Sequence, residues 1–223
     1  MALVAIGAAY WLRNNVDGLI KRAIETQGSQ MTGAPVLVGA VKISALDGRG
    51  ELSYLVIGNP KGFKSLYALE VDSVLVEIDI TTLTKDVVVI KRIDVVAPNV
   101  VYEKSATATN FDAIQKNITA ALGSSDEKKD GKKIIVDHFA LRGAKAEVSA
   151  AFMNGKTIGI SLPDITLNHI GRAKNGVTPG EFGQIVAAAL KHKLTGAYNF
   201  ERALGATSEA LGKAGNAIKD IFK

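Results

Sequence analysis

The hydrophobic and polar positions of the chain follow two periods in successive blocks. Residues 12–24 carry apolar side chains at steps of three and four with charges between them, which predicts an N-terminal helix over 1–30. From 35 to 104 the period is two, and the connections between about five strands are short, so the pairing must be antiparallel. A strand pattern returns at 134–170. We therefore expect an α+β fold with a mainly antiparallel β-sheet over 35–175.

One face of each predicted strand is aliphatic. The alternation assigns two sets to this face, in the first and third strands: Leu37, Val41 and Ile43, and Val74, Val76, Ile78 and Ile80. Pro98 interrupts the fourth run, and after Pro163 the apolar set moves by one position, which marks a bulge or a kink. The aliphatic face is either a covered core or a groove for a flexible apolar ligand.

Helical patterns appear again between and after the strands. Residues 110–122 predict an inserted helix capped by Thr109 or Asn110, followed by a polar linker over 123–133. Asn154 and Gly155 predict a hairpin turn. Thr178 to Glu181 is a capping box that opens the C-terminal amphipathic helices of 178–223. The basic stretch 204–222 suits a membrane surface, a partner protein or packing on the chain's own sheet.

The first twelve residues carry no charge. As a helix they would rise about 18 Å, against roughly 30 Å for the hydrocarbon core of a bilayer. Tyr10, Trp11 and Arg13 stand where the apolar run ends, as aromatic and basic residues do at a membrane boundary. Two interpretations stay open: the end of a membrane anchor, or a buried or interfacial helical end.

Composition and motifs narrow the chemistry. The 223 residues are 47% hydrophobic with a net charge of +5, and they include no cysteine, which excludes thiolate catalysis and cysteine-held metals. Three histidines lack partners at ligand spacing, and the phosphate-loop, dinucleotide and nucleophile-elbow motifs are absent. Aromatic and basic residues do not interleave along any strand, as single-stranded nucleic acid would require. We therefore expect no enzyme, metal site, cofactor or nucleic-acid partner.

A set of loop and strand motifs carries a family resemblance over residues 1–122. Its most specific parts are the loop Gly58-Asn59-Pro60-Lys61-Gly62-Phe63 and the segment from Pro98 to Glu103, followed by Asn110-Phe111. In these motifs the chain resembles the N-terminal region of AsmA-family proteins of bacterial envelopes, which is itself similar to the chorein-type start of bridge-like lipid transfer proteins.

The resemblance implies a bent sheet whose aliphatic face handles membrane lipid or another amphiphile. It also implies an anchor in the bacterial inner membrane with the sheet on the periplasmic side. The long members build an extended groove, whereas this chain has room only for its beginning. We therefore expect a membrane-anchored, lipid-handling sheet. The alternative is a non-catalytic accessory subunit that docks an envelope protein partner through its terminal helices.

Overall fold

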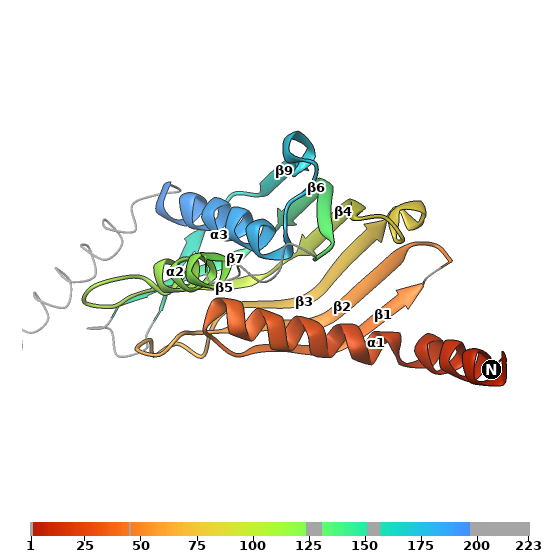
Figure 1. Cartoon of the computed structure of the whole chain (residues 1–223). Coiled ribbons are helices and arrows are strands. Elements are labelled where there is room, and N and C mark those ends of the chain that lie inside the picture. The colour runs from red at the N-terminus through yellow and green to blue at the C-terminus, as the bar shows by residue number, and fades with distance from the viewer. Residues whose placement is uncertain (1, 45, 124–130, 151–156, 197–223) are drawn as a thin grey trace, which may run out of the picture.

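The computed structural model describes residues 2–44, 46–123, 131–150 and 157–196. In the N-terminal helix it describes side chains from Val16 onward. The predicted hairpin turn at Asn154 and Gly155, most of the linker 123–133, and the stretch 204–222 lie outside the described residues. The α+β class and the mainly antiparallel sheet are confirmed. Figure 1 shows the helices on one side of a long, bent sheet.

The described residues form nine strands in one sheet. Their bounds are β1 (Val36–Ser44), β2 (Arg49–Gly58), β3 (Tyr67–Ile78), β4 (Val87–Val96), β5 (Asn99–Lys104), β6 (Lys133–Arg142), β7 (Lys145–Ala150), β8 (Ile158–Ser161) and β9 (Ile165–Ile170). The helices are α1 (Ala2–Thr32), α2 (Asn110–Gly123) and α3 (Pro179–Gly196), with short 3₁₀ turns at Ile80–Thr82 (η1) and Arg172–Lys174 (η3).

Strands β4 and β5 lie one after the other along β3. The second half of β3 pairs with β4, and its first half pairs with β5. β6 and β7 run parallel to β4 and β5, and β9 and β8 pair antiparallel with β6 and β7. The parallel step was not predicted. It is made possible by α2, which supplies the crossover connection that parallel strands need.

Regular strand structure is interrupted along one line across the sheet, which we call the crease and which passes through Gly39, Tyr54, Asp72, Ala97 and Gly143. Tyr54, Ala97 and Gly143 have φ angles of 56°, 49° and 63°, in the left-handed region. At the crease the pairing skips one residue in β1, β2 and β3. Because side chains alternate between faces, each skipped residue moves the following apolar set to the other parity.

Helix α1 lies along the free edge of β1 and hydrogen-bonds to its backbone. Ser29 Oγ, Glu25 Oε1 and Asp17 Oδ1 accept from the N–H groups of Val36, Val38 and Ile43 at 2.8, 2.9 and 3.1 Å. Lys21 Nζ donates to Gly39 O at 3.0 Å. These four side chains, at positions 17, 21, 25 and 29, are the edge clamp. They satisfy polar groups that an uncovered edge strand would expose.

An apolar row of α1 lies next to the edge clamp. It includes Val16, Ile20 and Ile24, all partly buried, and it ends at the buried Thr32. Leu19 and Ala23, which also belong to the apolar pattern of residues 12–24, are exposed. The spacing predicted a continuous helix here, and the structure has one; its buried row follows steps of four.

Candidate functional site

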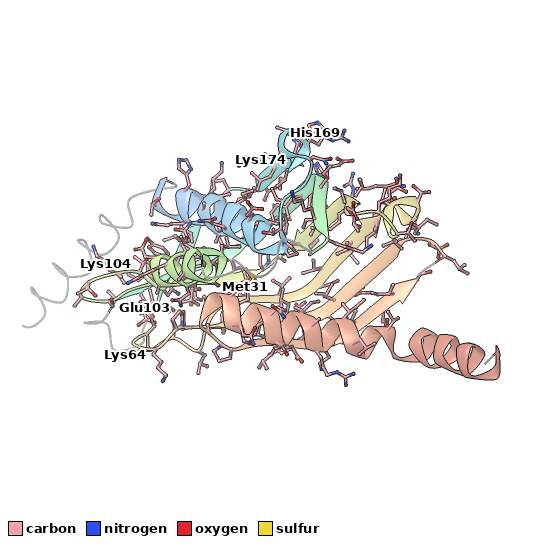
Figure 2. The ribbon with its side chains drawn as sticks, viewed as in Figure 1. Met31, Lys64, Glu103, Lys104, His169 and Lys174 are labelled. Atoms are coloured by element: carbon pink, nitrogen blue, oxygen red, sulfur yellow. The ribbon has the colours of Figure 1, made fainter. Side chains whose placement is uncertain are left out.

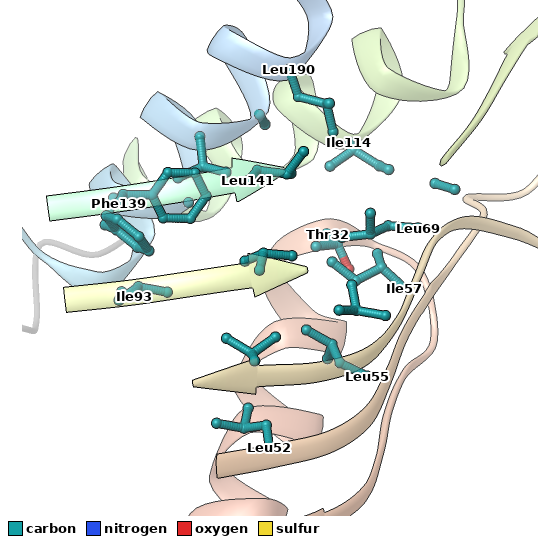
Figure 3. A pocket seen from close by; sticks show the side chains of 18 of the residues that line it. Thr32, Leu52, Leu55, Ile57, Leu69, Ile93, Ile114, Phe139, Leu141 and Leu190 are labelled. Carbon is teal, nitrogen blue, oxygen red and sulfur yellow. The ribbon is translucent and has the colours of Figure 1, made fainter. Parts of the chain in front are cut away.

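An apolar cavity of about 360 Å³ lies between the sheet and the helices. Its floor comes from β2, β3, β4 and β6, and its other walls come from α2, α3 and the C-terminal end of α1 (Figure 3). The lining residues are Thr32, Leu52, Leu55, Ile57, Ala68, Leu69, Val71, Val74, Val76, Ile93, Val95, Phe111, Ile114, Ile118, Phe139, Leu141, Phe182, Gly183, Val186, Ala187 and Leu190.

The lining is almost entirely hydrocarbon. Thr32 is its one residue with a polar side chain, and its hydroxyl donates to Gly28 O at 2.7 Å and accepts from Ala34 N at 3.3 Å. The hydroxyl is therefore already used within the end of α1. A ligand inside the cavity would meet methyl, methylene and ring groups, and its polar end would have to stay outside.

The crease explains how the floor stays apolar along its length. In β2 the lining residues are Leu52 before the crease and Leu55 and Ile57 after it. In β3 they are Ala68, Leu69 and Val71 before it and Val74 and Val76 after it. Paired residues of neighbouring strands share a face, and the register pairs Leu52 with Val74 and Leu55 with Val71. The change of parity in each strand therefore keeps the same face of the sheet aliphatic.

The roof of the cavity is made by the apolar stripes of α2 and α3. Phe111, Ile114 and Ile118 of α2 are buried at 4 to 5% exposure. From α3, Phe182 packs edge-on against Phe139 of β6, with ring centroids 5.9 Å apart. The capping box predicted at Thr178 is confirmed: its N–H donates to Glu181 Oε2 at 2.7 Å, which fixes where α3 begins.

Two polar contacts join the roof helices to each other. Lys191 of α3 forms an ion pair with Asp112 of α2, and Gln184 Nε2 donates to Thr119 Oγ1 at 3.0 Å. Burial of Asp112 acts to raise its pKa, but hydrogen bonds from Lys191 and Thr109 outweigh this effect and hold the pKa below its ordinary value. The same hydrogen bond to Asp112 raises the pKa of Lys191.

The cavity is not sealed. Leu52, Leu55, Val76 and Phe182 are partly exposed although they line it. Figure 1 shows strands β2, β3 and β4 between helices α1 and α3. Solvent therefore reaches the lining at these four residues.

Five of the seven predicted face residues fall into three groups. Val74 and Val76 line the cavity. Val41 and Ile43 share the face of the cavity, since they pair with Leu52 and Gly50, but they lie beside α1 and outside the lining. Ile78 is partly buried at the end of β3, also outside the lining.

Two of the predicted face residues are wrongly assigned. Leu37 points to the opposite face and is 57% exposed, because the crease at Gly39 changes the parity of β1. Ile80 is not in a strand: β3 ends at Ile78, and Ile80 opens the 3₁₀ turn η1 with 44% exposure. Asp79, which caps that turn, stops the strand.

Tyr10, Trp11 and Arg13 lie within helix α1, in the part whose side chains are outside the description. Within the described residues, no helix is both long enough and apolar enough to cross a bilayer. The membrane-proximal role of these three residues stays a prediction.

The two most specific sequence motifs meet in a buried polar network away from the cavity. The carboxylate of Glu103, 3% exposed, accepts from the N–H groups of Lys64 and Ser65 at 2.8 and 2.7 Å. Asn110 Nδ2 donates to Asn59 Oδ1 at 2.9 Å, and Asn59 Nδ2 donates to Ser65 O at 2.8 Å. Figure 2 shows Lys64 and Glu103 at the same end of the molecule. The network fixes the loop 59–65 and the start of α2.

Sequence reasoning missed most of the cavity because it considered the sheet alone. The stripes of α2 and α3 were visible at helical spacing, but the pattern does not show that they stand off the sheet and leave space. Among the described residues, no group of three or more metal-ligating side chains comes together. No protein-family model, curated protein or solved structure matches the chain.

Proposed function

We propose that this protein binds the acyl chain of a membrane lipid or another amphiphile in its apolar cavity, without catalysing a reaction. The observation that carries the proposal is an open cavity of about 360 Å³ whose one polar lining group already has partners. This volume falls within the range of about 300–1,000 Å³ that small-molecule sites occupy.

The binding energy would come from burial of hydrocarbon. Each methylene group removed from water contributes about 0.8 kcal/mol, so affinity should depend on chain length and only weakly on the headgroup. The lining offers no charged group to recognise a carboxylate or a phosphate. Selectivity would therefore follow the length and flexibility of the apolar part.

The resemblance to the AsmA family supports a location for this activity. We propose that the N-terminal segment with Tyr10, Trp11 and Arg13 attaches the protein to the bacterial inner membrane, with the sheet on the periplasmic side. The competing proposal is an accessory subunit whose terminal helices dock an envelope protein. A stoichiometric partner that is lost when 204–223 is deleted, together with no acyl binding, would favour that alternative.

A chain-length series tests the proposal directly. Saturated fatty acids of 8 to 16 carbons compete with a fluorescent fatty acid for the full chain. Affinity should rise about fourfold for each added methylene and then level off once the cavity is filled. Affinities that do not depend on chain length would contradict binding in an apolar cavity.

Gly183 offers a variant that fills the cavity. It lines the cavity from α3, and a Cβ atom built on it meets nothing within 4 Å, so the backbone leaves room for the start of a side chain there. Gly183→Trp should reduce acyl binding at least tenfold while the protein stays folded. Gly183→Ala should keep binding and stabilise α3 by about 0.5–1 kcal/mol.

Ala188 provides the matched control, because it lies on α3 with its side chain exposed. Ala188→Trp adds the same ring outside the cavity and should leave binding unchanged. Equal binding by Gly183→Trp and Ala188→Trp, with both variants folded by circular dichroism, would place the ligand elsewhere.

A further inference from the structure

One border of the sheet exposes apolar side chains on separate turns. Strands β1, β3 and β9 end at this border, and strands β2, β4 and β6 begin there. Leu46 is 86% exposed in the turn between β1 and β2, and Ile80 and Leu83 are 44% and 43% exposed in the turn between β3 and β4. We call the described residues of these turns, 44, 46–49, 79–86, 131–133 and 171–176, the apolar-basic border.

The turns of the apolar-basic border are joined to one another. Ile78 N donates to Gly48 O at 2.7 Å, and a Cβ on Gly48 would lie 2.9 Å from Ile80 Cγ2, so the first two turns are in contact. Lys132 Nζ donates to the carbonyl groups of Leu83 and Lys85 at 2.6 and 3.1 Å. A Cβ on Gly176 would lie 2.6 Å from Lys133 Cβ, which connects the last turn.

The border is basic as well as apolar. Its turns hold six basic residues, Arg49, Lys85, Lys132, Lys133, Arg172 and Lys174, and three acidic ones, Asp47, Asp79 and Asp86. Two of the three carboxylates have local partners: Asp79 accepts from Thr81 N at 3.0 Å, and Asp47 from Ser44 Oγ at 2.7 Å. Asp137 of β6, just behind the border, pairs with Arg172 at 2.8 Å.

The uncharged start of the chain lies at the same end of the molecule. Asp17 accepts from the N–H of Ile43 near the end of β1, so residues 2–16 of α1 run past this border (Figure 1). Residues 1–12 are the uncharged part of the sequence. The apolar helix end and the exposed Leu and Ile side chains therefore share one side.

We propose that the apolar-basic border docks on the surface of an anionic bilayer. Leu46, Ile80 and Leu83 would enter the boundary of the acyl chains, and Lys85, Lys132 and Lys174 would lie at the level of the lipid phosphates. Apolar side chains surrounded by lysine and arginine are the pattern that interfacial binding requires, and each basic residue adds attraction to acidic lipid. The proposal rests on the proposed membrane attachment but does not depend on acyl binding in the cavity.

A tryptophan reporter tests the docking in the full chain. Trp11 is the one native tryptophan, so Trp11→Phe provides a background without tryptophan signal. In this background, Leu46→Trp should shift its emission to the blue and be quenched by brominated lipid on vesicles of phosphatidylcholine with 30% phosphatidylglycerol. Raising the salt concentration should weaken the effect, because the attraction to acidic lipid is screened.

The opposite border supplies a stringent control. Leu66 is 91% exposed in the loop between β2 and β3, near Lys64, so Leu66→Trp is a leucine replaced in a similarly basic loop. It should neither shift nor be quenched. Leu83→Trp is a second reporter in case the first variant does not fold, and it should behave like Leu46→Trp.

The outcomes are distinct. Quenching at positions 46 and 83 but not at 66 supports the docking. No quenching at 46 and 83, or equal quenching at all three positions, overturns it. Because this assay detects the position of the border on vesicles, its result is separate from the chain-length series, which tests the cavity.

Discussion

Single residues in the left-handed region hold the crease in place. Ala97 has a φ angle of 49° between β4 and β5, and its N–H donates to Arg142 O at 2.8 Å. Gly143, its neighbour on the next strand, has a similar φ of 63°. For a residue with a Cβ atom this conformation costs about 1–2 kcal/mol, whereas glycine adopts it freely. The sheet therefore stores strain at Ala97 that it does not store at Gly143.

Ala97→Gly should stabilise the protein by up to about 1 kcal/mol. The substitution removes the left-handed strain, and the greater freedom of glycine in the unfolded chain offsets part of the gain. Urea unfolding measures the change. Ala40→Gly, in an exposed position of β1, serves as the control and should destabilise by about 0.5–1 kcal/mol. A loss of stability in both variants would show that Ala97 is not strained.

At the scale of elements, the most consequential contact is that of α1 with β1. An edge strand with free N–H and C=O groups is a template for pairing with another chain. Here the edge clamp occupies three N–H groups and one carbonyl of β1 through side chains. A helix thus completes the sheet where a further strand would otherwise lie. The roof helices α2 and α3 instead stand over the cavity.

Glu25→Ala should lower the free energy of unfolding by about 1–2 kcal/mol. The variant leaves the N–H of Val38 without its carboxylate acceptor, and hydrogen bonds to charged groups contribute more than neutral ones. Amide hydrogen exchange at Val38 should become faster.

Two control variants accompany Glu25→Ala. Glu25→Gln keeps an acceptor oxygen and should lose less stability. Gln27→Ala, on the exposed side of α1, should change stability by less than about 0.5 kcal/mol, and a loss equal to that of Glu25→Ala would contradict the clamp.

At the scale of the whole molecule, stability should depend on pH through the contact between the roof helices. The pKa of Asp112 is held below its ordinary value of 3.8, so the contribution of its ionised form is complete above that pH. This contribution is lost as the pH falls through the lowered pKa. The pKa of Lys191 is raised from 10.5, so its contribution is present below that pH and is lost as the pH rises through the raised value.

We therefore expect the melting temperature of Asp112→Asn to lie below that of the native protein between about pH 4 and 10, and the two to converge toward pH 2. The variant keeps a side-chain oxygen that can accept a hydrogen bond from Thr109 at the start of α2. Lys191→Met should show a similar gap over the same range. Asp72→Asn, an exposed position, should follow the native curve throughout. A gap for Asp112→Asn that persists unchanged at pH 2 would exclude the ion pair as its cause.

More of the fold than of the cavity could be predicted from the amino-acid sequence. Alternation and proline positions predicted the interruptions at Pro98 and Pro163, and β4 ends at Val96 before the first of them. The face predicted for Leu37 was wrong. Gly39 is left out of the pairing of β1, and because glycine has no side chain, the alternating pattern does not show that the apolar face changes there. The cavity could be predicted only in part, since Val74 and Val76 were assigned to it but the distance between helices and sheet depends on packing far along the chain.

The edge clamp also limits how far a helix can follow a strand. From Ser29 to Asp17 the helix rises about 18 Å over 12 residues, whereas the seven steps from Val36 to Ile43 would span about 23 Å of strand. The difference of about 5 Å exceeds the tolerance of a hydrogen bond, so it must be absorbed by side chains of unequal reach and by the crease at Gly39. One further turn of helix would increase the mismatch. The unequal rise per residue of helix and strand must therefore be accommodated across the four contacts of the edge clamp, and β1 itself ends at Ser44, one residue after the last clamped N–H.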